Sequence, residues 1–237
     1  MQTTWMFLAA PAMALIAACS SDSKKSTPDA LRIVDSPVAT IDAPPACNIS
    51  KTDFGDLGTV AMGLSTYSPG MAANNLPAAP YVFLGTALSA ATPPDVIYVE
   101  FYSGFTPFGT LAAPTAAVPG TYPLTGEQLQ YSSCGVCITA GAKVLQDGSN
   151  SGDFMATGGS VKITTNGAAV GGTLAVELSN VTFEEVTFND MGVSTPVGNG
   201  CNTKVTKLIY SGMMVAPSAK PSKPGQRTGV KLVRSSF

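Results

Sequence analysis

The run from Thr173 to Phe188 is the longest stretch of this chain that alternates apolar and polar residues. Its first half, Leu174 to Leu178, places apolar side chains on one face of an extended strand, the period of two that is typical of a half-buried sheet. The alternation slips at Asn180 and again at Glu184 and Glu185, which indicates β-bulges or a bend between two sheets. A continuous helix is disfavoured because Val, Thr and Phe follow the β-type period. The run predicts a long, bent strand.

Shorter runs of the same kind recur, and residues typical of turns separate them. Asn166–Gly167 is a strong hairpin signal, and the polar segment from Asp147 to Asp153 is a second turn. Hairpins predominate and no crossover helix is visible. We therefore predict an all-β domain of about eight strands, as an antiparallel β-sandwich or jelly-roll. The expected strands are 57–65, 81–84, 95–103, 121–124, 137–145, 155–165, 173–188 and 204–215.

The composition agrees with a sheet protein and excludes several functions. Charged residues make up 12% of the 237 residues, so few stretches could form an amphipathic helix with a charged outer face. The chain has no His, which removes the commonest general base, the usual zinc ligand and every Ser–His or Cys–His pair. Residues 47–216 hold five basic and eleven acidic residues, and this acidic balance argues against a nucleic-acid partner.

The first nineteen residues have the pattern of an export signal. Phe7 to Ala18 is an apolar run shorter than the ~20 residues that span a bilayer. Ile16-Ala17-Ala18-Cys19, a large aliphatic residue and two small residues before a cysteine, resembles the bacterial lipobox. The preceding segment, residues 1–6, has no Lys or Arg. An ordinary cleaved signal peptide and an uncleaved helical anchor are the alternatives.

On this resemblance the chain is similar to a bacterial lipoprotein of the cell envelope. The resemblance implies that residues 1–18 are removed and that Cys19 is acylated, as by palmitate, and anchors the protein to a membrane. The outer membrane or the cell surface is expected rather than the inner membrane. Residues 19–46 are rich in Ser, Asp, Pro and Ala and should form a disordered tether, followed by a β domain at 47–216. Residues 217–237 should form a basic, disordered tail.

Four cysteines remain once Cys19 is acylated, and an even number in an oxidising compartment predicts two disulfides in one of three pairings. We prefer Cys134 with Cys137 and Cys47 with Cys201, because the second bond would tie the entry of the domain to its last strand. Pairing Cys47 with one member of the Cys134–Cys137 motif, and Cys201 with the other, is the alternative.

The Cys134-Gly-Val-Cys137 spacing also fits a thioredoxin-like redox site. That chemistry needs a thiolate stabilised by a helix N-terminus or a nearby cation. The residues that follow alternate like a strand and include Gly141, so we favour a structural disulfide. A four-thiolate zinc site is the third interpretation, and an oxidising compartment disfavours it.

Two polar segments offer other chemistry. Asp147, Asn150 and Asp153 carry oxygen atoms that Ca²⁺ prefers, although a plain hairpin turn explains the same residues. Glu184 and Glu185 suggest a carboxylate pair for glycoside hydrolysis, but adjacent strand residues normally point to opposite faces. We expect neither a metal site nor a catalytic pair.

Four tyrosines could form a surface on which a sugar stacks, with core or rim packing as the simpler interpretation. The function that we expect is a non-enzymatic binding or structural module without a cofactor, for an unidentified protein or glycan ligand. A thiol–disulfide oxidoreductase that uses Cys134 and Cys137 is one alternative. A calcium- or carbohydrate-binding adhesin module is the other. The tyrosines are Tyr98, Tyr102, Tyr122 and Tyr131.

Overall fold

The computed structural model describes residues 47–60, 63–71 and 76–217. The predicted signal peptide, Cys19, the tether and all of the tail beyond Pro217 lie outside these residues. Within the described ranges, no helix has both the length and the apolar character needed to cross a bilayer.

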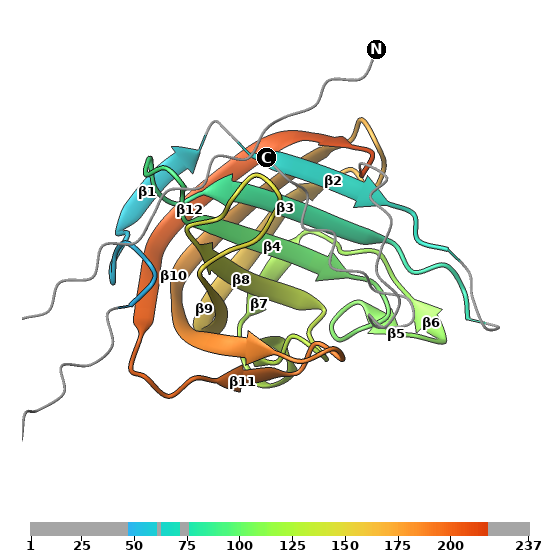
Figure 1. Cartoon of the computed structure of the whole chain (residues 1–237). Helices are drawn as coiled ribbons and strands as arrows, with labels where there is room; N and C mark the ends of the chain where they lie inside the picture. Colours follow the sequence, from blue (N-terminus) through green and yellow to red (C-terminus); the bar gives the residue numbers. More distant parts are fainter. Residues whose placement is uncertain (1–46, 61–62, 72–75, 218–237) are drawn as a thin grey trace, which may run out of the picture. The chain divides into compact units, whose positions relative to one another are not determined.

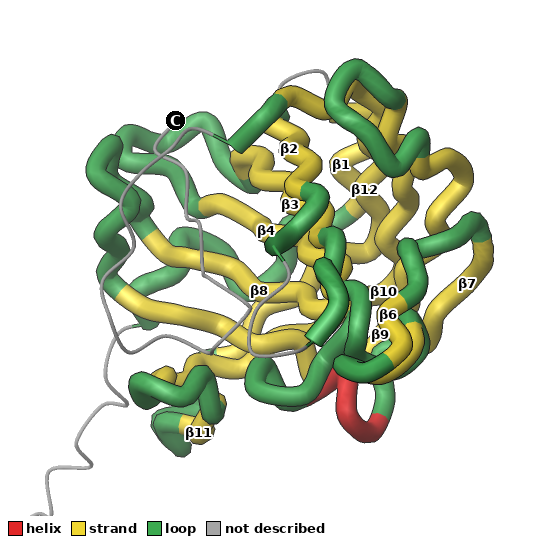
Figure 2. The backbone as a smooth tube through the Cα atoms, turned by 90° about the vertical axis from the view of Figure 1, so that its right-hand side faces the viewer, coloured by secondary structure: helices red, strands yellow, loops and turns green. Residues whose placement is uncertain are grey.

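The domain is built from strands, which confirms the all-β prediction (Figure 1). One four-residue 3₁₀ helix, η1 (Gly126–Leu129), follows β7 and contacts β8 and β9; it is red in Figure 2. The strands are β1 (Asp56–Val60), β2 (Leu64–Ser68), β3 (Tyr81–Ala87), β4 (Val96–Tyr102), β5 (Gly109–Thr110), β6 (Ala113–Pro114), β7 (Gly120–Pro123), β8 (Val136–Ala142), β9 (Gly152–Asn166), β10 (Thr173–Phe188), β11 (Ser194–Pro196) and β12 (Asn202–Val215).

Ten of these strands belong to one continuous sheet, in the order β1-β12-β2-β3-β4-β8-β9-β10-β11, with β7 paired to β9. Strand β10 also pairs with β12, the second strand in this order, so the path from β12 through β2 to β10 closes on itself. The hairpins are antiparallel as predicted. Strand β12, however, pairs in parallel with both β1 and β2, because the first strands of the domain lie beside its last strand.

The long strands β9 and β10 bend together in mid-course. Gly159 has a φ of +109°, and a Cβ atom there would lie 2.7 Å from the Asn180 carbonyl oxygen, so this approach requires glycine. Asn180 has a φ of +51°, and the pairing of the two strands shifts between Ser179 and Thr182. Before its bend β9 pairs with β8, and after the bend it pairs with β7. The predicted slip at Asn180 is confirmed.

The second predicted slip, at Glu184 and Glu185, is misplaced. The pairing with β9 shifts just before them, between Thr182 and Phe183, but it runs in register through both glutamates, and the inward alternation continues from Phe183 to Glu185. Val186 and Phe188 lie on the opposite face, where they join a second apolar cluster. The sequence suggested a slip because apolar residues change sides there, but the change reflects a second buried face.

Strands β4 and β8 are buried along their whole lengths. Ile97, Val99 and Phe101 of β4 face the main core, and burial of each such side chain contributes about 1.5–3 kcal/mol. The opposite face is covered as well, so this strand is buried on both sides, although its alternating sequence is of the kind typical of a half-buried sheet. The second cluster that covers part of it consists of Tyr102, Tyr131, Cys134, Cys137, Met155 and Val186.

Candidate functional site

The Cys134–Cys137 motif forms a tight, buried link at the start of β8. The two sulfurs lie at disulfide distance, with the Cα atoms 5.3 Å apart, and both residues have no exposed surface. The motif runs into a strand instead of opening a helix, so it does not place its own sulfurs at a helix N-terminus. Glu100 pairs directly across from Cys137, and a neighbouring carboxylate disfavours a thiolate. These surroundings favour a structural disulfide over a reactive thiolate.

Cys47 and Cys201 also lie at disulfide distance, with their Cα atoms 5.4 Å apart and their positions 154 residues apart in the sequence. The preferred pairing of the four cysteines is therefore the one found in the structure. Nearby, Glu185 accepts hydrogen bonds from the side-chain amides of Asn48 (3.3 Å) and Asn199 (2.6 Å). These contacts hold the entry of the domain against β10 and the segment before β12.

Beside the Cys134–Cys137 link, Glu100 accepts hydrogen bonds from the hydroxyls of Tyr102 and Tyr131, the second at 2.8 Å. The two hydroxyls also lie 2.9 Å apart. Burial, and then the charge of Glu100, raise the pKa of Tyr102 well above its usual value. Three polar groups that satisfy one another inside an apolar cluster stabilise a single packing arrangement. We assign them a structural role.

The predicted calcium ligands are engaged in local hydrogen bonds. The Oδ1 atom of Asp147 accepts from both the amide and the hydroxyl of Ser149, and the side-chain amide of Asn150 donates to Asp153 Oδ1 over 2.9 Å. Asn150 thus presents its nitrogen, not its oxygen, to Asp153. Among the described residues, no three His, Cys, Asp or Glu side chains are grouped as metal ligands.

Glu184 and Glu185 point to opposite faces of β10, so they do not flank a common space. The four tyrosines do not form one surface either. Tyr98, Tyr102 and Tyr131 are at most 3% exposed, whereas Tyr122 is half-buried and lines a hollow. The structure thus brings one predicted aromatic residue to a candidate site and places the others in the core.

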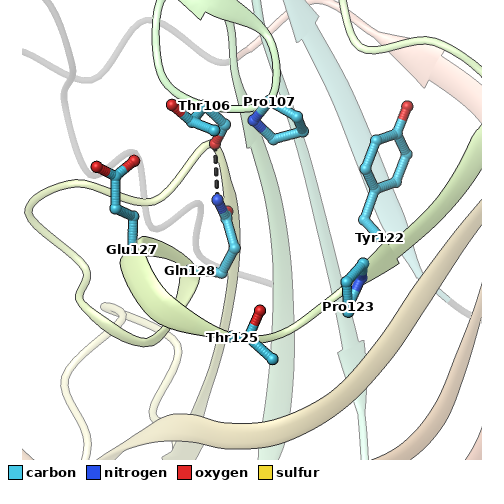
Figure 3. A pocket seen from close by; sticks show the side chains of 7 residues that line it. All are labelled: Thr106, Pro107, Tyr122, Pro123, Thr125, Glu127 and Gln128. Carbon is cyan, nitrogen blue, oxygen red and sulfur yellow. Dashed lines mark hydrogen bonds between the residues drawn. The ribbon is translucent and has the colours of Figure 1, made fainter.

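The hollow around Tyr122, here the Tyr122 hollow, has a volume of about 450 Å³. Sites for small ligands commonly have volumes of about 300–1,000 Å³. Figure 3 shows its side chains around one open space, with Tyr122 and Pro123 on one side and Glu127 and Gln128 on the other. The lining residues are Thr106, Pro107, Tyr122, Pro123, Thr125, Glu127 and Gln128.

Two hydrogen bonds fix Gln128 as the floor of the hollow. Its amide nitrogen donates to the Thr106 carbonyl oxygen over 2.8 Å, and its amide oxygen accepts from the Val136 amide over 2.7 Å (Figure 3 shows the first). The Gly135 amide donates to the same Thr106 oxygen over 3.1 Å, and a Cβ atom at Gly135 would clash with that oxygen. The Cys134–Cys137 loop thus holds Thr106 and Gln128, two residues that line the hollow, in place.

Tyr122 is held in place from two sides. Its hydroxyl donates to the Val118 carbonyl oxygen over 2.6 Å, and its ring packs edge-on against Phe108, with 5.2 Å between ring centroids. Partial burial raises the pKa of Tyr122 above its usual value, so the hydroxyl stays neutral at physiological pH. The ring is a fixed, uncharged wall.

A second hollow of about 440 Å³ lies where β9, β10 and β12 meet. The side-chain hydroxyls of Thr157 and Thr182 share a hydrogen bond, with 2.9 Å between their oxygen atoms, and Lys204 forms a salt bridge with Asp53. No aromatic face is exposed there, because Phe183 is 1% exposed. The Tyr122 hollow has the more varied lining and is the better candidate site.

Tyr122 is among the residues predicted from the sequence as a possible binding surface, whereas the other lining residues were not predicted. Thr106 and Pro107 lie between the expected strands 95–103 and 121–124, and Gln128 lies in a helix too short to have a periodic pattern. Three prolines between Gly104 and Gly120 were the available signal of a fixed loop. No family model, no curated protein and no solved structure matches the chain, so the hollow is interpreted from its own chemistry.

Proposed function

We propose that this protein is a lipid-anchored module of the cell envelope that binds a ligand non-covalently in the Tyr122 hollow. The observation that carries the proposal is the pairing of all four cysteines between Cys47 and Cys201 at disulfide distance. Disulfides persist in oxidising compartments outside the cytoplasm. Two such pairs in one domain agree with the export and acylation that the Ile16–Cys19 motif implies.

The lining of the hollow supports binding rather than catalysis. A nucleophilic mechanism needs a nucleophile within hydrogen-bond reach of a base. The lining residues comprise threonines, prolines, a tyrosine, a glutamine and Glu127. Both ends of the Gln128 amide are engaged, and the Tyr122 hydroxyl is bonded to Val118. The remaining polar groups can hold and orient a ligand.

Thiol–disulfide exchange by Cys134 and Cys137 is the alternative that the surroundings disfavour. Exchange requires a thiolate to reach a sulfur, and both sulfurs here are buried beside Glu100. An insulin-reduction assay tests this alternative directly. We expect no turnover above that of a Cys134→Ala/Cys137→Ala double variant, and turnover well above that control would overturn the non-enzymatic part of the proposal.

Anchoring is tested by comparing the wild type with a Cys19→Ser variant in cells fed labelled palmitate. The wild type should incorporate the label and sediment with membranes, whereas Cys19→Ser should lose the label and leave the membrane fraction. Ser20→Ala is the matched control, since it changes the next residue and keeps the acceptor thiol. A Cys19→Ser protein that stays in the membrane fraction would contradict lipid anchoring.

A further inference from the structure

We propose that the Tyr122 hollow binds an uncharged sugar unit of a glycan, held between the ring of Tyr122 and the carboxylate of Glu127. This inference rests on the proposed binding function and names its ligand class. It follows from three properties of the hollow: its apolar faces, the polar groups that have no bond within the described protein, and its charge.

The apolar faces come from Tyr122, Pro107 and Pro123. Both prolines are exposed, and the tyrosine ring is fixed by Val118 and Phe108. A sugar ring has one face of C–H groups, which packs against aromatic and pyrrolidine surfaces. A fixed wall loses little conformational freedom when a ligand binds, so less of the interaction energy is spent on ordering.

The polar groups are those of Thr106, Thr125 and Glu127. Thr125 caps η1 without a side-chain hydrogen bond, and within the described ranges no side-chain hydrogen bond or ion pair involves the Thr106 hydroxyl or the Glu127 carboxylate. All three side chains are exposed at the hollow. A carboxylate accepts two hydroxyl hydrogens, and each threonine hydroxyl both donates and accepts. These groups match the hydroxyl rim of a sugar.

The charge of the hollow selects among sugars. Glu127 is the charged side chain in the lining, and it repels a phosphate, a sulfate or a uronic acid brought into the same space. Among the described residues that line the hollow there is no lysine or arginine, so no cation of this lining would pair with an anionic ligand. An uncharged, hydroxyl-rich ring fits both sides of the hollow.

The test is isothermal titration of the full chain in detergent with two uncharged tetrasaccharides, cellotetraose and tetra-N-acetylchitotetraose. Tetragalacturonate serves as the anionic comparison. We expect at least one uncharged tetrasaccharide to bind, and at least tenfold more tightly than tetragalacturonate. Absence of heat with both uncharged probes, or preference for the uronate, would overturn the ligand class. The lipid anchor would stand, since it is tested by fractionation.

Variants then locate the site. Glu127→Gln, Thr125→Val and Tyr122→Leu should each weaken binding about fivefold to tenfold, because each removes one interaction of about 1 kcal/mol. Tyr122→Phe keeps the ring and should bind within about twofold of the wild type. Glu184→Gln, on β10 and outside the lining, is the matched control. Equal affinity for wild type, Glu127→Gln and Tyr122→Leu would overturn this location even if an uncharged sugar binds elsewhere.

Discussion

Cys47–Cys201 closes a loop of 154 residues at the entry of the domain, whereas Cys134–Cys137 joins residues three positions apart in its interior. Around the first pair, the hydroxyl of Thr203 donates to the Lys51 carbonyl oxygen, so residues 47–55 and 201–206 form an entry junction. The second pair lies beneath the Tyr122 hollow. Constraint of the unfolded chain grows with loop length. The first pair should therefore govern global stability, and the second the local geometry of the hollow.

The largest expected effect is loss of the entry disulfide. Replacing Cys47 and Cys201 by alanine together should lower the free energy of unfolding by about 4–5 kcal/mol, because the unfolded chain regains the freedom of a long loop. Urea denaturation followed by circular dichroism measures this change. A loss below about 1 kcal/mol would show that the rest of the entry junction already fixes the chain, and the contrast between the two pairs would fail.

The inner disulfide should contribute less to stability. A Cys134→Ala/Cys137→Ala double variant should lose about 2 kcal/mol, the value of the chain-entropy model for so short a loop. Its local effect should be larger, with faster amide hydrogen exchange at Gly135 and Val136, whose amides support the floor of the hollow. Unchanged hydrogen exchange at these two amides would show that the inner disulfide does not maintain the geometry of the hollow.

Alkaline pH tests the packing beside the inner pair. Because the pKa of Tyr102 is raised, the folded state keeps this proton above pH 10 while the unfolded state releases it. Stability from this group is therefore complete below about pH 10 and falls as the pH rises further. Tyr102→Phe should reduce that fall by up to about 1.4 kcal/mol per pH unit. Tyr122→Phe, at a less buried tyrosine, should change the loss of stability per pH unit by a smaller amount. An equal loss per pH unit in the Tyr102→Phe protein and the wild type would contradict the burial of Tyr102.

The smallest effect belongs to the surface of the entry junction. The side chain of Lys204 donates to Asp53 over 2.9 Å, and this bond is the main cause that lowers the pKa of Asp53. The resulting stability is present above pH 3.8, the usual pKa of the group, and is lost as the pH falls below it. Asp53→Asn should thus be slightly less stable than wild type at pH 7 and equal to it at pH 2. The pair is solvent-exposed, so 1 M salt should largely abolish the difference.

How much could be predicted from the sequence depended on the range of the interactions. The bounds of β10 match the predicted run from Thr173 to Phe188, because alternation within one strand is a local signal. The first predicted strand, 57–65, is instead two strands, β1 and β2, and their parallel partner β12 lies more than 140 residues away. Nothing local to residues 57–65 indicates that pairing.

The same reason explains the candidate site. Tyr122 could be predicted as a possible ligand contact because aromatic side chains commonly line binding sites. Its packing against Phe108 and its hydrogen bond to Val118 could not be predicted, because they depend on the conformation of a proline-rich loop. The preferred cysteine pairing could be predicted because one bond would tie the entry of the domain to its last strand. The burial of Glu100 between two tyrosines could not be predicted in this way, because the second apolar cluster combines residues from β4, β8, β9 and β10.

The entry disulfide also determines how the domain responds to mechanical load. A pull on the chain at Cys47 passes through the disulfide to Cys201 and so reaches the start of β12, which is hydrogen-bonded to β10 along most of its length. The stretch between the two cysteines, which lie 154 positions apart, would otherwise extend by roughly 500 Å at about 3.3–3.6 Å per residue. With the disulfide closed, a pull between the two ends of the chain cannot release that length. Tension along the chain would thus bypass the strands between Cys47 and Cys201.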